Sequence, residues 1–263
     1  MSIAIVGEHL IHYEAIGRGE PIIFIHGWVG SWRYWWPSMQ ALARQHRTFA
    51  YDICGFGDSS KDPNTYSLDR AVEMLDQFIT RLGIITPPTL VGHTLGAAVA
   101  LRFAGRHPEK IKRLIGVSLP LFGAEMHDRL LLGNLDDERA RVVGRAGPYP
   151  EIDSEVHKTD PRAIAALAAE LKTISPAQEF ERCPVPVLLV FGEQDPVIPP
   201  PAAAGDQLTL APKRQRIVTL PNSQHFPMLE RPAQFNRLVH EFMRANGDLS
   251  SLSPKEYWQR RTF

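Results

Sequence analysis

The residue best placed to take part in a chemical reaction is Thr94, at the centre of residues 92–96 (GHTLG). An apolar segment, residues 89–91, precedes this motif, and a helical pattern begins at Leu95. The flanking glycines permit a turn so tight that the central side chain projects alone above a sheet. This is the layout of a nucleophile elbow, which makes Thr94 our candidate nucleophile. Ordinary helix starts also carry Gly and Thr, so a simple helix cap is the alternative interpretation.

A threonine hydroxyl is a poor nucleophile at its own pKa, so it needs a general base, and that base needs an orienting acid. The chain offers ten histidines. His225 lies in a loop that leaves a predicted strand, residues 215–220, and Pro227 is placed to open the next helix. His240 lies inside that helix, where a surface or packing role is expected. The alternative for His225 is a capping or buried hydrogen-bonding role.

Three motifs together resemble the α/β-hydrolase fold superfamily. They are residues 92–96, residues 191–199 (FGEQDPVIP) and residues 221–232 (PNSQHFPMLERP). The resemblance implies that Asp195 is the acid and His225 the base, in the chain order nucleophile, acid, histidine. Some members place the acid after an earlier strand, but residues 118–122 (SLPLF) contain no carboxylate. Glu193 is the alternative acid, although its expected role is to bind backbone amides of the loop.

The same resemblance assigns residues 26–30 (HGWVG) to an oxyanion-hole loop. The backbone N–H groups of Trp28 and Leu95 would then face a developing oxyanion, each contributing roughly 3 kcal/mol to the transition state. A glycine-containing turn anchored by a tryptophan is the alternative. The candidate substrate-pocket residues lie beside the elbow or at the apolar start of the predicted cap: Trp28, His93, Leu119 and Phe122. For His93, packing is favoured over direct proton transfer.

Threonine at the elbow departs from the serine that this superfamily nearly always carries. A β-branched residue tolerates the strained elbow backbone less well than serine, at a cost of about 1–3 kcal/mol. Its γ-methyl group can also crowd the oxyanion hole. Three interpretations remain open: a slow natural hydrolase, a homologue that binds or transforms ligands without an acyl-enzyme, and a substitution of an original serine.

The elements that must position these residues alternate between strand and helix. Strands are predicted at residues 2–6, 10–16, 21–25, 47–51, 89–91, 111–117, 185–191 and 215–220. The main helices are predicted at residues 32–44, 95–105 and 227–246, and Ser67 can cap a further helix that carries apolar residues from Ala71 to Ile79. This alternation predicts an α/β class, and with the resemblance an α/β-hydrolase fold: a mostly parallel eight-stranded sheet flanked by helices. Asp52, in the loop of residues 51–59, is expected to tie down turn amides.

Strand patterns stop between residues 119 and 182, where short helical pieces are predicted at residues 128–132, 138–143 and 161–172. We interpret residues 119–182 as a helical cap inserted into a core of residues 1–118 and 183–248, with a C-terminal tail at 249–263. Apolar residues in the cap suggest an apolar pocket, although they could equally form the cap's own core.

Composition excludes several classes of protein. The chain has 263 residues, of which 44% are hydrophobic and 22% charged, as in ordinary globular proteins. Lys plus Arg and Asp plus Glu each total 29, and no basic stripe occurs, so neither nucleic acid nor a membrane surface is an expected partner. Two distant cysteines, Cys54 and Cys183, are interpreted as free thiols. With no leader or long apolar stretch, a cytoplasmic location is expected.

These observations favour a hydrolase that acts on a small carboxylic ester or related acyl compound through Thr94, His225 and Asp195. No metal or organic cofactor is expected, because neither a ligand cluster nor a phosphate-binding glycine loop occurs. The alternatives are a ligand-binding homologue with little or no turnover, and a non-hydrolytic enzyme such as a lyase or carbon–carbon bond-cleaving enzyme on the same fold. The sequence indicates neither the substrate nor the oligomeric state.

Overall fold

The computed structural model describes residues 2–123, 149–201, 208–211, 213–245, 248–250 and 252. A single eight-stranded sheet runs through them in the order β1-β2-β4-β3-β5-β6-β7-β8. The strands are β1 (Ser2–Val6), β2 (His9–Gly17), β3 (Glu20–Ile25), β4 (His46–Tyr51), β5 (Thr89–His93), β6 (Arg113–Val117), β7 (Val187–Gly192) and β8 (Gln215–Leu220). β2 pairs antiparallel with β1 and β4, and every other pairing is parallel. The predicted α/β-hydrolase fold is confirmed.

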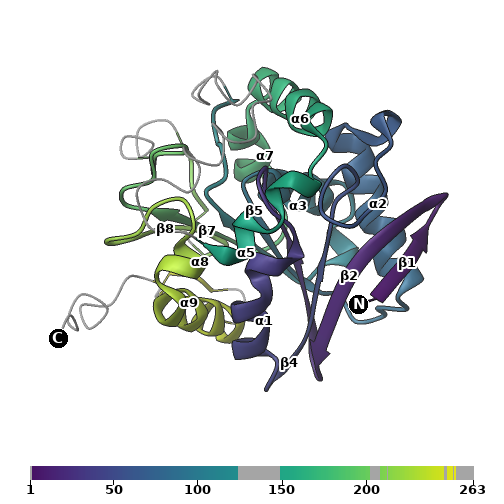
Figure 1. The fold of residues 1–263 in the computed structure, drawn as a ribbon. Helices are drawn as coiled ribbons and strands as arrows, with labels where there is room; N and C mark the ends of the chain where they lie inside the picture. The colour runs from purple at the N-terminus through teal and green to yellow at the C-terminus, as the bar shows by residue number, and fades with distance from the viewer. Residues whose placement is uncertain are drawn as a thin grey trace.

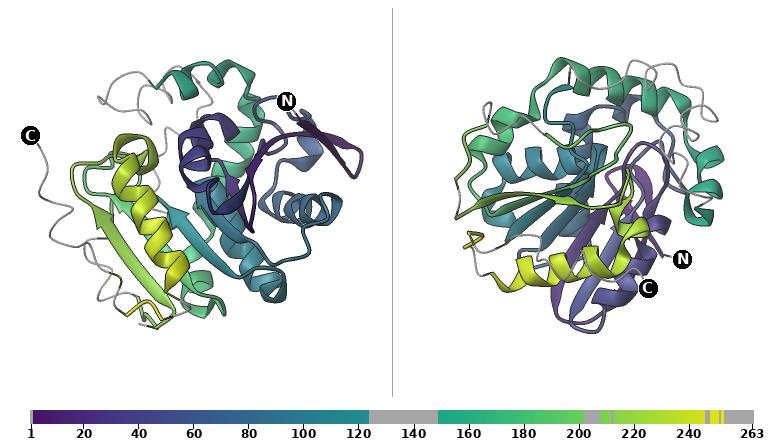
Figure 2. Two further views of the ribbon diagram at one scale, coloured as in Figure 1. Left: turned by 90° about the horizontal axis from the view of Figure 1, so that it is seen from below. Right: turned by 90° about the vertical axis from the view of Figure 1, so that its left-hand side faces the viewer.

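Helices cover both faces of this sheet (Figures 1 and 2). On one face α1 (Trp36–Leu42) contacts α9 (Pro232–Arg244), and on the other α2 (Leu68–Arg81) contacts α3 (Leu95–Arg106). Because β5, β6 and β7 are covered on both sides, every residue in them is buried. Ser67 caps α2 as expected, by accepting a hydrogen bond from the Arg70 amide.

Between β6 and β7 the described residues are helical, with α5 (Pro150–Asp153), the 3₁₀ turn η6 (Val156–Lys158), α6 (Pro161–Thr173) and α7 (Pro176–Arg182). The helix predicted at residues 161–172 is thus confirmed, whereas the predicted pieces at 128–132 and 138–143 lie outside the described residues. Polar contacts attach this segment to the core: Arg33 Nε lies 2.8 Å from Glu155 Oε1, and the Tyr66 hydroxyl donates to Asp160. In Figure 1, α6 and α7 lie above the strands.

Two helix predictions need correction. The single helix predicted at residues 227–246 is wrong, because the structure has α8 (Pro227–Glu230) and then α9, separated at Arg231. Pro232 explains the break, since a proline disfavours helical geometry in the residue before it, and Arg231 has φ −132° and ψ 54°. The helix predicted at residues 32–44 begins as a 3₁₀ turn, η1 (Trp32–Trp35), capped by Ser31.

Candidate active site

Thr94 stands at the turn between β5 and α3, with φ 45° and ψ −105°, and is fully buried. This conformation is unfavourable for a β-branched residue and costs on the order of 1–3 kcal/mol. Glycine is required on both sides of the turn because backbone atoms of neighbouring segments lie where a side chain would begin. A Cβ on Gly92 would lie 2.3 Å from the Gly96 oxygen, and a Cβ on Gly96 would lie 2.3 Å from the Ile25 oxygen. The tight elbow predicted from the sequence is therefore present.

Asp195 and His225 are brought together by the loops that follow β7 and β8. His225 Nδ1 lies 2.8 Å from Asp195 Oδ2 and 3.0 Å from Oδ1, and both side chains are buried. The amides of Val197 and Ile198 each donate to Oδ1 at 2.9 Å. Burial alone would raise the pKa of Asp195, but the His225 charge and these hydrogen bonds outweigh it and lower that pKa. Asp195 is thus an ionised carboxylate that orients His225.

Thr94 and His225 are not hydrogen-bonded to each other. Within the described part of the chain, neither Thr94 Oγ1 nor His225 Nε2 has a hydrogen-bond partner, and both atoms are buried. The Thr94 hydroxyl is directed at Gly27, where a Cβ atom, if the residue had one, would lie only 2.1 Å from Oγ1. The site therefore contains an oriented base and an elbow hydroxyl, with the hydroxyl turned toward the loop that follows β3.

Ser118 is a site residue that the sequence pattern did not indicate. It follows β6 with φ 47°, is fully buried, and donates its hydroxyl hydrogen to Asp195 Oδ2 at 2.9 Å. Its amide bonds to the Val190 oxygen, which continues the β6–β7 ladder. The end of β6 is where some members of the superfamily carry the acid, and here it supplies a hydroxyl donor to the acid instead. In the sequence, the feature that could have pointed to Ser118 is its position in the turn directly after a predicted strand.

The loop after β3 is held by buried aromatic side chains. The Gly27 amide donates to the Tyr34 hydroxyl at 2.6 Å, and the Gly27 oxygen accepts from His26 Nδ1 at 2.8 Å. His26 Nε2 accepts in turn from the Ile53 amide, which fixes its tautomer. His93 Nδ1 lies 3.1 Å from the same Tyr34 hydroxyl, and His93 Nε2 lies 2.8 Å from the backbone oxygen of His225. Neither Tyr34 nor His26 was singled out from the sequence.

The two residues expected to bind an oxyanion are Leu95, directly after Thr94, and Trp28, directly after Gly27, which lies against the Thr94 hydroxyl. Leu95 is the first residue of α3, so its N–H has no intrahelical acceptor. Trp28 follows Gly27 and is 1% exposed, so its indole is part of the core. Of the other predicted pocket residues, Leu119 is buried and Phe122 is half-buried, both directly after β6. Their contact with a substrate remains a prediction.

Two other carboxylates bind backbone amides, as expected. Asp52 accepts from the Trp32 amide at 2.8 Å and the Asp58 amide at 2.9 Å, and Glu193 accepts from the Asn222 amide at 3.0 Å. Asp52 also bonds to His12 Nδ1, and these two residues with Asp58 form a group whose ligand atoms lie within 4.8 Å of one another. Since the Asp52 oxygens already accept these bonds, the group is explained as a scaffold.

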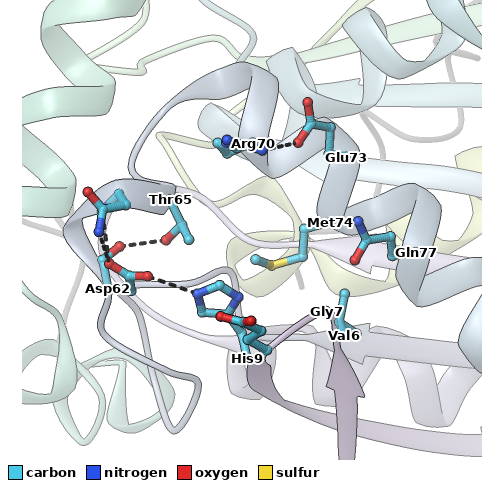
Figure 3. Close-up of a pocket in the computed structure, with 11 residues that line it drawn as sticks. Val6, Gly7, His9, Asp62, Thr65, Arg70, Glu73, Met74 and Gln77 are labelled. Atoms are coloured by element: carbon cyan, nitrogen blue, oxygen red, sulfur yellow. Dashed lines mark hydrogen bonds and ion pairs between the residues drawn. The ribbon is translucent and has the colours of Figure 1, made fainter.

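A surface cavity of about 280 Å³ lies between the β1–β2 turn and the first half of α2 (Figure 3). Two pairs of its ionisable side chains contact each other: His9 Nε2 lies 3.0 Å from Asp62 Oδ2, and Arg70 lies 2.7 Å from Glu73. None of the three candidate catalytic residues lines this cavity.

Among the helices that the structure describes, none is long and apolar enough to span a membrane.

The fold and the site geometry together define an α/β protein with a tight, glycine-flanked strand-to-helix turn at Thr94 and a buried Asp195–His225 pair in the loops after β7 and β8. Residues 20–155 match the family model described as the alpha/beta hydrolase fold. The chain belongs to this family.

Curated relatives cover most of the chain. It is 28% identical to a 2-hydroxy-6-oxo-6-(2'-aminophenyl)hexa-2,4-dienoic acid hydrolase from Metapseudomonas resinovorans, over 90% of this chain and 89% of the relative. It is also 28% identical to a pimeloyl-acyl-carrier-protein methyl ester esterase from Nitrosomonas europaea, over 86% and 96% respectively. These relatives are hydrolases, which supports hydrolase activity in this chain.

Solved structures agree on the fold. A thermophilic esterase from Thermogutta terrifontis matches with a TM-score of 0.79 and 20% identity, over 94% of this chain and 98% of that one. The enol-lactonase from Burkholderia xenovorans matches with a TM-score of 0.79 and 20% identity, over 92% and 100%. At this identity the likeness defines the fold and leaves the substrate open.

Proposed function

We propose that this protein hydrolyses a small carboxylic ester or related acyl compound through Thr94, His225 and Asp195. The observation that carries the proposal is the buried Asp195–His225 pair, 2.8 Å apart, whose outer nitrogen has no partner among the described residues. The His225 ring lies 4.8 Å from the ring of His93, the residue directly before Thr94. A histidine held in this way is ready to accept a proton at Nε2. Ester and acyl chemistry is also what the names of several relatives describe.

In the proposed reaction, Thr94 turns about its χ1 bond so that Oγ1 approaches His225 Nε2. Oγ1 attacks the carbonyl carbon while its proton passes to Nε2, and the N–H groups of Trp28 and Leu95 bind the oxyanion. The tetrahedral intermediate collapses, the C–O bond to the alcohol breaks, and His225 returns the proton to the alcohol. Water then attacks the acyl-threonine by the same route and releases the acid.

One observation favours a second candidate. Because the Thr94 hydroxyl faces Gly27 and has no hydrogen bond to His225, the Asp195–His225 pair is free to act as a general base without a protein nucleophile. It would then remove a proton from the substrate itself, as lyase chemistry requires, or from a bound water that attacks the substrate directly.

Steady-state and burst kinetics with short-chain p-nitrophenyl esters test the proposal. The informative variants are Thr94→Val, which keeps the shape of the side chain but removes its hydroxyl, and His225→Gln, which removes the base. Loss of turnover in both variants supports the acyl-threonine mechanism. Turnover that survives in Thr94→Val but is lost in His225→Gln would replace it with the general-base candidate.

A further inference from the structure

His93 uses both of its ring nitrogens in a fully buried position directly before Thr94. Nδ1 lies 3.1 Å from the Tyr34 hydroxyl, and Nε2 lies 2.8 Å from the backbone oxygen of His225. The Tyr34 hydroxyl is also the acceptor of the Gly27 amide. These bonds join residues that are 59 and 132 positions apart from His93 in the chain.

When the His93 ring is neutral, the donors and acceptors in this chain of bonds can be arranged in one order only. The Gly27 N–H can only donate, so the Tyr34 oxygen accepts, and the phenolic hydrogen is left to donate to His93 Nδ1. The ring proton of His93 must then be on Nε2, where it donates to the His225 carbonyl, which can only accept. The order is therefore Gly27 N–H to Tyr34, Tyr34 O–H to His93, and His93 N–H to His225.

The surroundings keep His93 neutral. Burial and the nearby His225 charge lower the pKa of His93 well below its usual value. The two imidazole rings lie with their centroids 4.8 Å apart, so a second positive charge on His93 would oppose protonation of His225. A neutral ring at this position leaves His225 free to accept the proton of the nucleophile.

We propose that Tyr34 and His93 are positioning residues, which lock the oxyanion-hole loop and the backbone of the catalytic histidine onto the nucleophile elbow through this directional chain. The inference rests on the proposed function of His225 and Thr94. It goes beyond the packing role expected for His93, because packing alone needs neither the phenolic hydrogen nor a particular tautomer.

Tyr34→Phe separates positioning from packing. Phenylalanine keeps the ring contacts of Tyr34 with His93, Trp35 and Phe226, but it removes the hydroxyl that connects Gly27 to His93. Tyr51→Phe is the matched control, since Tyr51 is equally buried and its hydroxyl has no hydrogen-bond partner in the described structure. At position 93, His93→Gln retains an N–H donor for the His225 carbonyl, whereas His93→Phe retains none.

The first readout is the ¹⁵N NMR signature of His93, assigned by its loss in His93→Gln. The parent protein should show the neutral Nε2–H tautomer. Tyr34→Phe should keep that tautomer, because the His225 carbonyl remains, but should shift the Nδ1 resonance, because Nδ1 no longer accepts the phenolic hydrogen. A parent in which His93 carries its proton on Nδ1, or on both nitrogens, overturns the proposal. This readout needs no substrate, so it is independent of whether the protein hydrolyses esters.

The second readout is the division of the kinetic effect between kcat and KM. Tyr34→Phe should lower kcat about tenfold and leave KM within about twofold, because the loop and the base shift while substrate contacts remain. His93→Gln should retain more kcat than His93→Phe. A kcat in Tyr34→Phe equal to that of Tyr51→Phe, or equal losses in the two His93 variants, would refute positioning. Absence of turnover in the parent would count against the proposed function and leave the NMR result to decide.

Discussion

The substitution Thr94→Ser should increase kcat by about 10- to 100-fold. The Thr94 hydroxyl lies beside Gly27 and has no hydrogen bond to His225, so we expect it to turn, together with its γ-methyl group, inside a fully buried site in order to reach Nε2. A misplacement of about 1 Å at a reacting centre costs about a hundredfold in rate. Each factor of ten corresponds to about 1.4 kcal/mol of barrier. Serine has no methyl group, so its hydroxyl can turn toward the base without displacing its neighbours.

The assay is stopped-flow release of p-nitrophenolate, which separates the acylation burst from steady-state turnover. The burst rate should rise most, because acylation contains the rotation. Thr89→Ser is the matched control: Thr89 is also buried in β5, and its hydroxyl contacts Met243, away from the site. A Thr94→Ser burst no faster than the parent, or an equal gain in Thr89→Ser, would refute the steric argument.

Three further predictions follow from the same geometry. Ser118→Ala should lower kcat about tenfold, because Asp195 loses a hydroxyl donor. Ser118→Gly should lose similar activity but should unfold at a higher urea concentration than Ser118→Ala, because glycine accepts the positive φ without strain. An unchanged kcat in both variants would exclude a role for this hydrogen bond. Folding lowers the pKa of Asp195, so its contribution to the free energy of unfolding is complete above the unfolded pKa of about 3.9 and is lost as pH falls through the folded pKa. Urea titrations between about pH 2 and 6 should therefore show the free energies of unfolding of the parent and Asp195→Asn converging at the acid end. A difference that stays constant over this range would contradict the direction of the pKa shift. Gly96→Ala should destabilise the fold by about 3 kcal/mol, because its Cβ would meet the Ile25 oxygen. Gly105→Ala is the control in the same helix: it has open space around it and should be neutral or stabilising by about 1 kcal/mol. Equal changes in the calorimetric melting temperatures of the two variants would contradict the close approach at Gly96.

The sheet was largely predictable from the sequence because hydrophobic patterns are local. β8 has the predicted bounds, and the uninterrupted apolar run of β3 indicated a strand covered on both faces. The strand predicted from residue 185 begins instead at Val187, after Pro186, since a proline has no N–H to donate to a ladder. The break at Arg231 also arises from a proline, and Pro232 was its visible signal.

The site was predictable only in part. The glycine-flanked turn indicated Thr94 as a candidate, and the resemblance of two loops to those of the α/β-hydrolase superfamily indicated Asp195 and His225. The bond of Ser118 to Asp195 could not be inferred, since it joins residues 77 positions apart and depends on a positive φ, although the position of Ser118 after a buried strand was visible. The same is true of the bonds that Tyr34 makes to Gly27 and His93. Such contacts depend on how strands are ordered in the sheet, which a local pattern does not encode.

Mass-spectrometric mapping of a trapped acyl-enzyme tests the central claim most directly. The protein is mixed with p-nitrophenyl acetate, quenched in acid during the burst, digested and sequenced by fragmentation. One acetyl group on Thr94, absent from Thr94→Val and from His225→Gln, is the predicted result. Sustained hydrolysis with no acetyl group on Thr94 would contradict the proposed nucleophile and leave the Asp195–His225 pair as a general base.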